Sequence, residues 1–388
     1  MRDRHRLSAA ACACAVALIA GTASAATPEA GTSVPETALA FARSLETSLN
    51  ACDSSLFDSS IAWDALVDRG TADLEVPETV RAEFATGIAR GFVLGDEICK
   101  AIRESGSYVL LNVRAVEGEP RALFRIVSES GLNYHDLLLS EADDGSVRIL
   151  DLFIYSLGEW VSQTARRGFL PLVAQLENGS LDRMKKGDNL YLDNVPNILK
   201  MQHHYQQGEF RKALDLFRAF PDELKNNRNI LMVRFAVAVQ LGGEEYDQAM
   251  LDLKTAFPDD PSLDLVLIDH YFNARQFDEA LRIVDRIDRS VGGDPYLDFM
   301  RANVLYAGGR RSEARAAARR AVEREPGLED PYWTLVTISL DERDFGETAK
   351  LLDEIETSLG LVVGDLTRIP EYSEFLESDA YDAWAASR

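Results

Sequence analysis

The chain has 388 residues, with 41 basic and 64 acidic side chains and a formal net charge of −23. Such a surplus of negative charge keeps a protein soluble and argues against binding to nucleic acid or to an anionic membrane. After the first 25 residues, no stretch is long and apolar enough to predict a membrane span. The length is sufficient for two domains.

The first 25 residues have the pattern of a secretory signal peptide. Arg2, Arg4 and Arg6 precede a short apolar run at residues 8–20, and the small residues 23–25 are typical of a cleavage site before Ala26. The sequence therefore predicts an exported protein, periplasmic or secreted, that is cleaved between Ala25 and Ala26.

Residues 36–176 have the pattern of an α+β domain. Helical spacing of apolar residues predicts helices over 36–52, 54–70 and 76–102. Four strand-like runs follow at 107–116, 121–128, 133–140 and 146–155, separated by short polar turns that contain glycine. These turns predict a four-stranded antiparallel meander, and residues 159–177 return to a helical pattern. Residues 177–194 are polar and are predicted to link this domain to the next.

The order of helices followed by a curved meander resembles the nuclear-transport-factor-two-like, cystatin-like α+β fold. Proteins with that fold often form a pocket between the sheet and the helices. The candidate residues for chemistry there are Tyr134, His135 and Asp136 on the third strand, near Arg114, Arg125 and Asp151. Adjacent strand residues point to opposite faces, so His135 and Asp136 cannot line one pocket without a bulge. A structural histidine and cross-strand ion pairs are the alternative interpretation.

Two cysteines, Cys52 and Cys99, remain once Cys12 and Cys14 leave with the signal peptide. In an oxidising compartment such a pair is often a disulfide, which we expect here. Two separate buried thiols are the alternative, because the sequence does not show whether the helices bring them together. Their spacing fits neither a metal site nor a redox Cys-x-x-Cys motif.

Residues 195–358 contain an internal repeat. Asp-Pro recurs at residues 260, 294 and 330, and a small residue recurs about every 34 positions, at Ala213, Ala249, Ala280, Ala314 and Thr348. An aromatic residue often stands three positions earlier, at Phe210, Tyr246, Phe277 and Phe345, with Arg311 as the departure. Each unit reads as two short antiparallel helices that must stack on a neighbour to bury their apolar faces. The aromatic-rich segment 364–388 is predicted to cap the end of the stack.

This pattern resembles the tetratricopeptide (TPR) repeat, with five units in all. The resemblance implies an all-α solenoid whose first helices line a groove for a protein or peptide partner. In this register the groove positions are Ile198, Gln202, Tyr205, Arg234, Asp269, Phe272, Tyr296, Phe299, Asn303, Tyr306 and Trp333. Aromatic, arginine and asparagine side chains are typical of peptide-binding surfaces, although solenoids also bury aromatics between repeats.

The leading hypothesis is an exported scaffold or adaptor that binds a protein or peptide in the cell envelope. The acidic composition favours a basic partner and salt-sensitive association. The sequence contains no recognised catalytic motif and gives no indication of a metal or cofactor. The alternative is a small-ligand-binding or enzymatic α+β domain, with the repeats as a docking or dimerising module. Self-association through the repeats is a third hypothesis.

Overall fold

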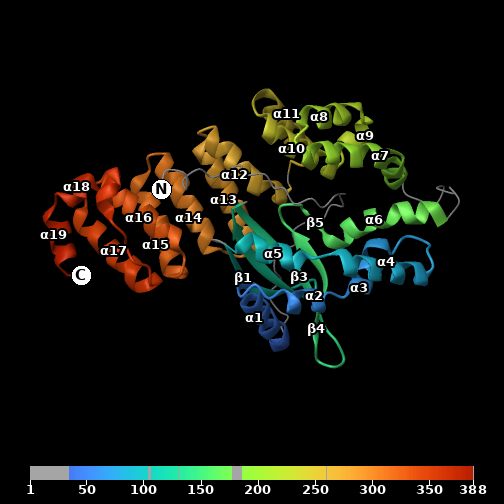
Figure 1. The fold of residues 1–388 in the computed structure, drawn as a ribbon, viewed down its shortest axis with the longest axis horizontal. Helices are drawn as coiled ribbons and strands as arrows, with labels where there is room; N and C mark the ends of the chain where they lie inside the picture. Colours follow the sequence, from blue (N-terminus) through green and yellow to red (C-terminus); the bar gives the residue numbers. More distant parts are fainter. Residues whose placement is uncertain (1–34, 104–105, 130, 177–185, 259, 388) are drawn as a thin grey trace. The chain divides into compact units, whose positions relative to one another are not determined.

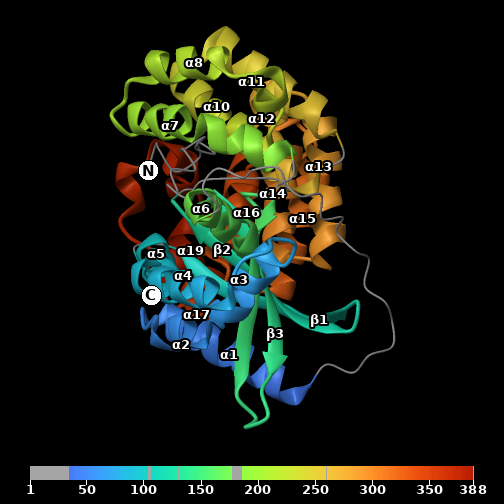
Figure 2. The ribbon, with the colours of Figure 1, turned by 90° about the vertical axis from the view of Figure 1, so that its right-hand side faces the viewer.

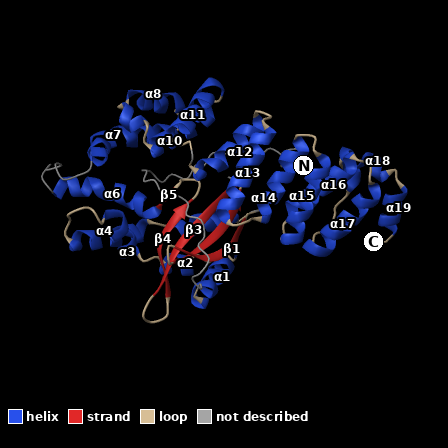
Figure 3. Cartoon of the chain, turned by 180° about the vertical axis from the view of Figure 1, so that it is seen from behind, coloured by secondary structure: helices blue, strands red, loops and turns tan. Residues whose placement is uncertain are grey.

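The computed structural model describes residues 35–103, 106–129, 131–176, 186–258 and 260–387. The predicted signal peptide lies outside the described residues. The chain divides into two compact units, the first ending at Leu265 and the second beginning at Val266. No described helix is long and apolar enough to cross a membrane. Figure 3 shows one sheet in an otherwise helical chain.

The first unit begins with an α+β domain, in the predicted order of helices and then strands (Figure 1). Five helices come first: α1 (Glu36–Asn50), α2 (Ser55–Ser60), α3 (Trp63–Thr71), α4 (Glu78–Gly91) and α5 (Leu94–Ile102). The sheet and a closing helix follow: β1 (Ser107–Val116), β2 (Glu119–Ser128), β3 (Gly131–Glu141), β4 (Val147–Ile154), β5 (Glu159–Trp160) and α6 (Val161–Leu176). The predicted fold class is therefore confirmed.

Two of the predicted helices are each broken in two. The break between α2 and α3 falls at Ile61. This residue forms an isolated parallel bridge with Ile149, which lies within β4. The break between α4 and α5 follows Gly91, where Phe92 takes up an extended conformation. The short strand β5 occupies the start of the segment predicted to be helical, because Trp160 pairs with Phe153 of β4.

The sheet is an antiparallel meander in the order β1-β2-β3-β4-β5. The turn between β1 and β2 has positive φ at Glu117 and at Gly118, as two-residue hairpin turns of the favoured type require. One face of the sheet is covered by α1 and α5 (Figure 2), and its buried side chains share one apolar core with those helices. Along β2, the residues in this core are Ala122, Phe124 and Ile126, at the period of two that a half-covered strand requires.

The same unit continues into helical repeats: α7 (Lys186–Gln206), α8 (Phe210–Ala219), α9 (Asp222–Lys225), α10 (Arg228–Leu241) and α11 (Gly243–Ala256). Helix α7 begins inside the predicted linker 177–194. It packs on α6, and Arg166 of α6 donates to Asp188 of α7 over 2.7 Å. Arg228 of α10 donates to the Leu157 carbonyl oxygen beside β5 over 3.0 Å. The α+β domain and these repeats are therefore joined by packing and by buried polar contacts.

The remaining repeats run through α12 (Asp264–Asn273), α13 (Phe277–Val291), α14 (Pro295–Ala307), α15 (Arg311–Arg324), α16 (Glu329–Asp341) and α17 (Phe345–Leu359). The boundary between the two units falls within α12 rather than in the predicted linker. Asp294 caps α14 by accepting the Tyr296 amide proton, with Pro295 in the first turn, as predicted. All five predicted small residues have no exposed surface: Ala213, Ala249, Ala280, Ala314 and Thr348. The predicted solenoid of paired helices is confirmed.

The predicted C-terminal cap consists of short helices rather than one. Two 3-10 turns, Leu366–Arg368 and Pro370–Tyr372, lead into α18 (Ser373–Leu376) and α19 (Asp379–Ala386). Phe375 and Trp384 are buried in the core formed with α16 and α17. The Trp384 indole also donates to Asp353 of α17 over 2.7 Å. This segment therefore covers the apolar end of the last repeat.

Asp298 of α14 is a buried carboxylate surrounded by arginines. It accepts from Arg301 one turn later on the same helix, and from Arg324 of α15 over 2.7 Å, while Arg320 lies 3.4 Å away. Arg301 also reaches back to Asp285 of α13 over 2.8 Å. One carboxylate therefore holds cationic side chains from both helices of its repeat, and one of them extends to the preceding helix.

We predict that Asp298→Ala lowers the free energy of unfolding by about 2–3 kcal/mol, because it leaves partly buried guanidinium groups without their shared partner. Asp285→Ala is the matched control, since that carboxylate is half exposed and its loss is expected to change stability by less than about 1 kcal/mol. Urea denaturation of the full chain, with hydrogen exchange in α14 and α15, measures both. Equal losses in the two variants would contradict the central role of Asp298.

Candidate functional site

A stripe of half-buried side chains runs along one face of α14. Tyr296, Phe299, Asn303 and Tyr306 are spaced by three, four and three residues, which places them on one side of a helix. The other side of α14, including Leu297 and Ala302, is buried in the repeat core. The rings of Tyr296 and Phe299 pack edge to face with their centroids 5.2 Å apart. We call these four side chains the α14 stripe.

Polar contacts join the α14 stripe to α16. The Tyr306 hydroxyl donates to Asp341 over 2.6 Å, and the Thr334 hydroxyl donates to the Asn303 amide oxygen over 3.2 Å. Partial burial and the Asp341 carboxylate raise the pKa of Tyr306 to about 12. The phenol therefore stays protonated and remains a hydrogen-bond donor at physiological pH.

Trp333 lies on α16, the helix that these polar contacts join to the α14 stripe. It is half-buried against the core of the last repeats, and its indole nitrogen donates to Glu329 over 2.8 Å, one turn earlier on the same helix. The α14 stripe and Trp333 together form a surface of apolar rings bordered by carboxylates. We call it the α14–α16 surface. The sequence analysis predicted the rings of this surface but missed Glu329 and Asp341. These two carboxylates are four and eight residues from Trp333, a spacing that places all three on one side of a helix.

Three of the other predicted groove residues are engaged within their own repeats. Arg234 is buried inside its repeat, where it donates to the Glu245 carbonyl oxygen over 3.0 Å and lies over the Phe217 ring. It belongs to the first unit, whereas the α14–α16 surface belongs to the second. Ile198 is also buried. Phe272 is half-buried and packs on Phe277 at the start of the next helix. These side chains stabilise their own repeats.

Asp269 of α12 is another predicted groove residue whose titration is changed by its surroundings. Burial raises the pKa of this carboxyl to about 6. It is therefore largely ionised only above that pH, and it can add negative charge to the second unit at neutral pH.

The candidate residues of the α+β domain divide between the two faces of the sheet, as strand alternation predicts. His135 lies on the helix-covered face, where the Tyr108 hydroxyl is 3.4 Å from its Nδ1 atom. Burial lowers the pKa of His135 to about 4, so the imidazole is neutral at physiological pH. This arrangement is that of a structural histidine with an aromatic neighbour.

Asp136 lies on the opposite face of the sheet, in an ion-pair network. Arg114 donates to it over 2.7 Å, and Arg121 lies 3.7 Å away and stacks on the Trp160 ring at 4.9 Å. Burial raises the pKa of Asp136, and the two arginines oppose that shift. His135 and Asp136 therefore do not act as a pair. The stacking of Arg121 on Trp160 was not predicted, because β5 was not.

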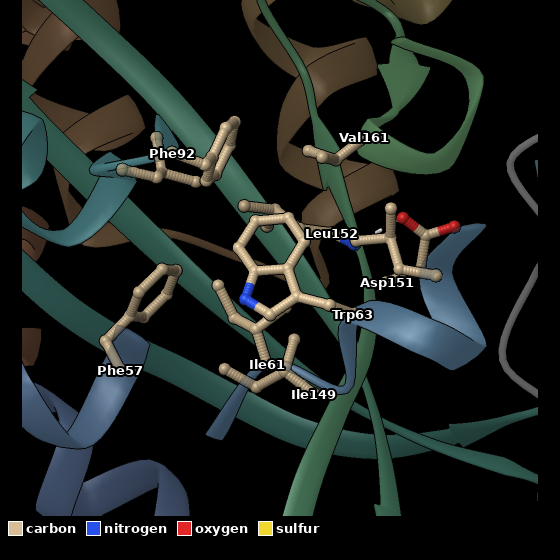
Figure 4. Close-up of a pocket in the computed structure, with 10 residues that line it drawn as sticks. Phe57, Ile61, Trp63, Phe92, Ile149, Asp151, Leu152 and Val161 are labelled. Atoms are coloured by element: carbon tan, nitrogen blue, oxygen red, sulfur yellow. Dashed lines mark hydrogen bonds between the residues drawn. The ribbon is translucent and has the colours of Figure 1, made fainter. Parts of the chain in front are cut away.

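A small hollow lies beside β4, lined by aromatic and aliphatic side chains and by Asp151 (Figure 4). The volume open to the centre of a water molecule is only ≈ 10 Å³, which is about the space of one water. The lining residues are Phe57, Ile61, Trp63, Leu66, Phe92, Leu94, Ile149, Asp151, Leu152 and Val161. The hollow is too small for an ordinary organic ligand. Within the described part of the chain, no group of acidic, histidine and cysteine side chains could hold a metal ion.

Asp151 is a buried acid beside this hollow. Its Oδ1 atom accepts the amide protons of Leu152 and Ser162, at 2.9 and 3.1 Å, and Arg69 lies 3.5 Å from Oδ2. Burial outweighs these contacts and raises the pKa of Asp151 to about 6. The charged form therefore destabilises the folded state at neutral pH.

No protein-family model and no curated protein matches the sequence. Parts of the chain are similar to solved structures of MamA. A structure described as MamA RS-1 ArsTM double mutant is 14% identical, covers 42% of this chain and 93% of that chain, and has a TM-score of 0.36. MamA AMB-1 is 15% identical, covers 46% of this chain and 98% of that chain, and has a TM-score of 0.34. Similarity at this level says nothing about what this chain binds.

We predict that Asp151→Asn removes a pH-dependent destabilisation. A carboxyl whose pKa is raised in the folded state binds protons more tightly when folded, so its contribution to stability falls as pH rises through the interval from about 4 to about 6. We compare the free energy of unfolding of the variant with that of the wild type at each pH. The difference, variant minus wild type, should be more positive at pH 7 than at pH 5 by roughly 1 kcal/mol. Denaturant titrations at both pH values measure it. The exposed Asp143→Asn is the control, and an identical pH dependence in the two variants would contradict the assignment.

Proposed function

We propose that the protein is an exported scaffold that binds a protein or peptide partner non-covalently on the α14–α16 surface. The observation that carries this proposal is the row of aromatic rings that remain half-exposed on α14 and α16, with polar side chains placed between them. Aromatic rings with nearby hydrogen-bonding groups are typical of the side chains that dominate binding energy in protein interfaces. The apparent signal peptide supports the proposed export.

The charges around this surface favour a basic partner. Glu329 and Asp341 border the rings, and each accepts a hydrogen bond from one of them through a single carboxylate oxygen. Asp341 also pairs with Arg311 over 3.4 Å, so Glu329 is the carboxylate with more capacity for a new donor. Asp330 lies beside them at the start of α16 and is exposed. A peptide with an apolar side chain between lysines or arginines would meet both features. Such an association weakens as salt screens the charges.

The alternative of a small-ligand site in the α+β domain has less support. Its hollow holds about one water, and its charged side chains pair with one another across the sheet. Binding through a scaffold requires only a continuous surface held in place by packed helices. The stacked repeats supply such a surface.

We expect Phe299→Ala and Trp333→Ala each to weaken binding of the partner by at least tenfold, because truncation of an aromatic anchor removes about 2 kcal/mol or more. The chain without residues 1–25 would first capture partners from an envelope extract at low and moderate salt. The captured protein, or its basic segment made as a peptide, would then be titrated by calorimetry.

Val362→Ala is the matched control, since this valine is 85% exposed in the loop after α17 and lies outside the α14–α16 surface. It should bind as the wild type does. Circular dichroism and thermal melts show whether each variant is folded. Wild-type affinity in both ring variants would refute the proposed surface. A mass that rises with protein concentration, and falls in both ring variants, would identify a second copy of this chain as the occupant.

A further inference from the structure

The two cysteines of the α+β domain meet where α1 ends. Cys52 follows α1 and is exposed, and its φ of 59° places it in the left-handed region that non-glycine residues rarely adopt. Cys99 lies on α5 and is only 3% exposed. The Cys52 backbone amide donates to the Leu49 carbonyl oxygen over 2.9 Å, and the Cys99 thiol donates to the same oxygen over 3.8 Å. Both thiols are free in the structure. Two cysteines that meet at one carbonyl oxygen need only local movement to form a disulfide.

Several contacts fix α5 against the chain that follows α1. The Cys99 thiol donates to the Leu49 carbonyl oxygen over 3.8 Å. The Ser54 hydroxyl donates to Asp96 over 2.8 Å, and the Gly95 amide donates to Asp58 over 3.2 Å. A Cβ atom at Gly95 would lie 2.7 Å from the Ser54 side chain, so glycine is required for this close approach. The Ser54–Asp96 and Gly95–Asp58 contacts therefore hold the two cysteines close together without involving either thiol.

We propose that Cys52 and Cys99 are an oxidation site, and that they form an intramolecular disulfide by exchange with a disulfide oxidant such as oxidised glutathione. Cys52 is the entry point, because it is the thiol that solvent and oxidant can reach. Cys99 completes the bond from the buried side. This inference is independent of the proposed binding surface, which lies in the other unit.

The exchange proceeds in two balanced steps. The Cys52 thiolate attacks one sulfur of oxidised glutathione, the glutathione S–S bond breaks, and one glutathione leaves as a thiolate. Cys99 then gives up its proton and attacks the Cys52 sulfur, which releases the second glutathione. The cysteine pair loses two electrons and two protons, and one oxidised glutathione becomes two reduced molecules.

The surroundings of Cys99 explain why Cys52 reacts first and Cys99 second. Burial raises the pKa of the Cys99 thiol to about 12, and the hydrogen bond and charge of Cys52 add to the shift. Cys99 is therefore a poor first nucleophile. Once Cys52 is in a mixed disulfide, its own negative charge is gone, and the part of the shift that it causes disappears. Attack by Cys99 becomes easier after Cys52 has reacted.

The bond would stabilise an edge of the sheet. Asn50, at the end of α1, donates to the Tyr108 carbonyl oxygen over 2.6 Å and accepts the Tyr108 amide proton over 3.1 Å. Glu46 accepts the amide proton of Leu110 over 3.0 Å. The side chains of α1 thus hydrogen-bond to backbone groups of β1. This strand lies at the edge of the sheet, and those backbone groups could otherwise pair with another chain. A disulfide beside Asn50 would hold α1 in this protective position.

The test is incubation of the chain without residues 1–25 in a buffer of reduced and oxidised glutathione. The sample is quenched with acid, alkylated in denaturant, and analysed by intact mass and peptide mapping. We expect monomers that have lost two hydrogens and contain a peptide linked through Cys52 and Cys99. We expect the oxidised form to melt about 5–10 °C above the reduced form, since the bond closes a long loop in the unfolded chain.

Cys52→Ser is the matched variant, because an exposed serine should not disturb the fold. It should leave Cys99 as a free thiol and abolish the rise in melting temperature on oxidation. Two thiols that stay open to alkylation in the oxidising buffer would overturn the proposal. So would a disulfide that links two chains, or an equal rise in melting temperature in Cys52→Ser.

Discussion

The repeat part of the molecule depends on close contact between helices at small side chains. Ala213, Ala249, Ala280 and Ala314 have no exposed surface, and Thr348 takes the same place in the last pair. A larger side chain there would push the two helices of a pair apart and open a cavity beside it, which a packed core does not tolerate. Because each pair also covers its neighbour, the spacing at one contact sets the placement of the next. The half-buried aromatic residues of α14 and α16 can form one surface only because this spacing between the helices is kept.

Contacts between its two helices order the α14–α16 surface. Tyr306 and Asn303 are held to α16 by Asp341 and Thr334. Side chains fixed in this way lose little rotational freedom on binding, so more of the interaction energy remains as affinity. The rings are also only half-buried, which leaves apolar area for a partner to cover. The proposed scaffold function needs both properties.

The sequence contains the signals that depend on local spacing. The period of 34 residues identified the repeats because the buried small residue recurs in each second helix, and the period of two identified the strands. The opposite faces of His135 and Asp136 also followed from strand alternation. The break at Ile61 could not be predicted in this way, because it depends on a bridge to Ile149, which is distant in the sequence.

The candidate site likewise contains some features that local spacing predicts and others that depend on contacts between distant segments. Tyr296, Phe299 and Tyr306 were predicted from the helix register and lie on one face, whereas Arg234 occupies an equivalent register position and is buried. Register gives the face of a helix but does not show which helix packs against that face. Arg234 is enclosed because Glu245 of α11 and the Phe217 ring of α8 surround its guanidinium group. Only the packed structure shows this difference.

The ion pairs of the second unit bear on the proposed preference for a basic partner. Within the second unit, Arg319 pairs with Glu347 of α17, Arg315 with Glu342 just after α16, and Arg343 with Glu374 of α18. These positive charges are therefore already engaged within the unit. Arg301 and Arg324 are bound to Asp298 in the same way. Arginines engaged in such pairs are less free to attract a partner. Asp341 is itself paired with Arg311, whereas Glu329, among the residues that the structure describes, accepts only from Trp333 and keeps its second carboxylate oxygen for another donor. A basic segment of the proposed partner would pair with Glu329 without breaking the ion pairs between the repeats.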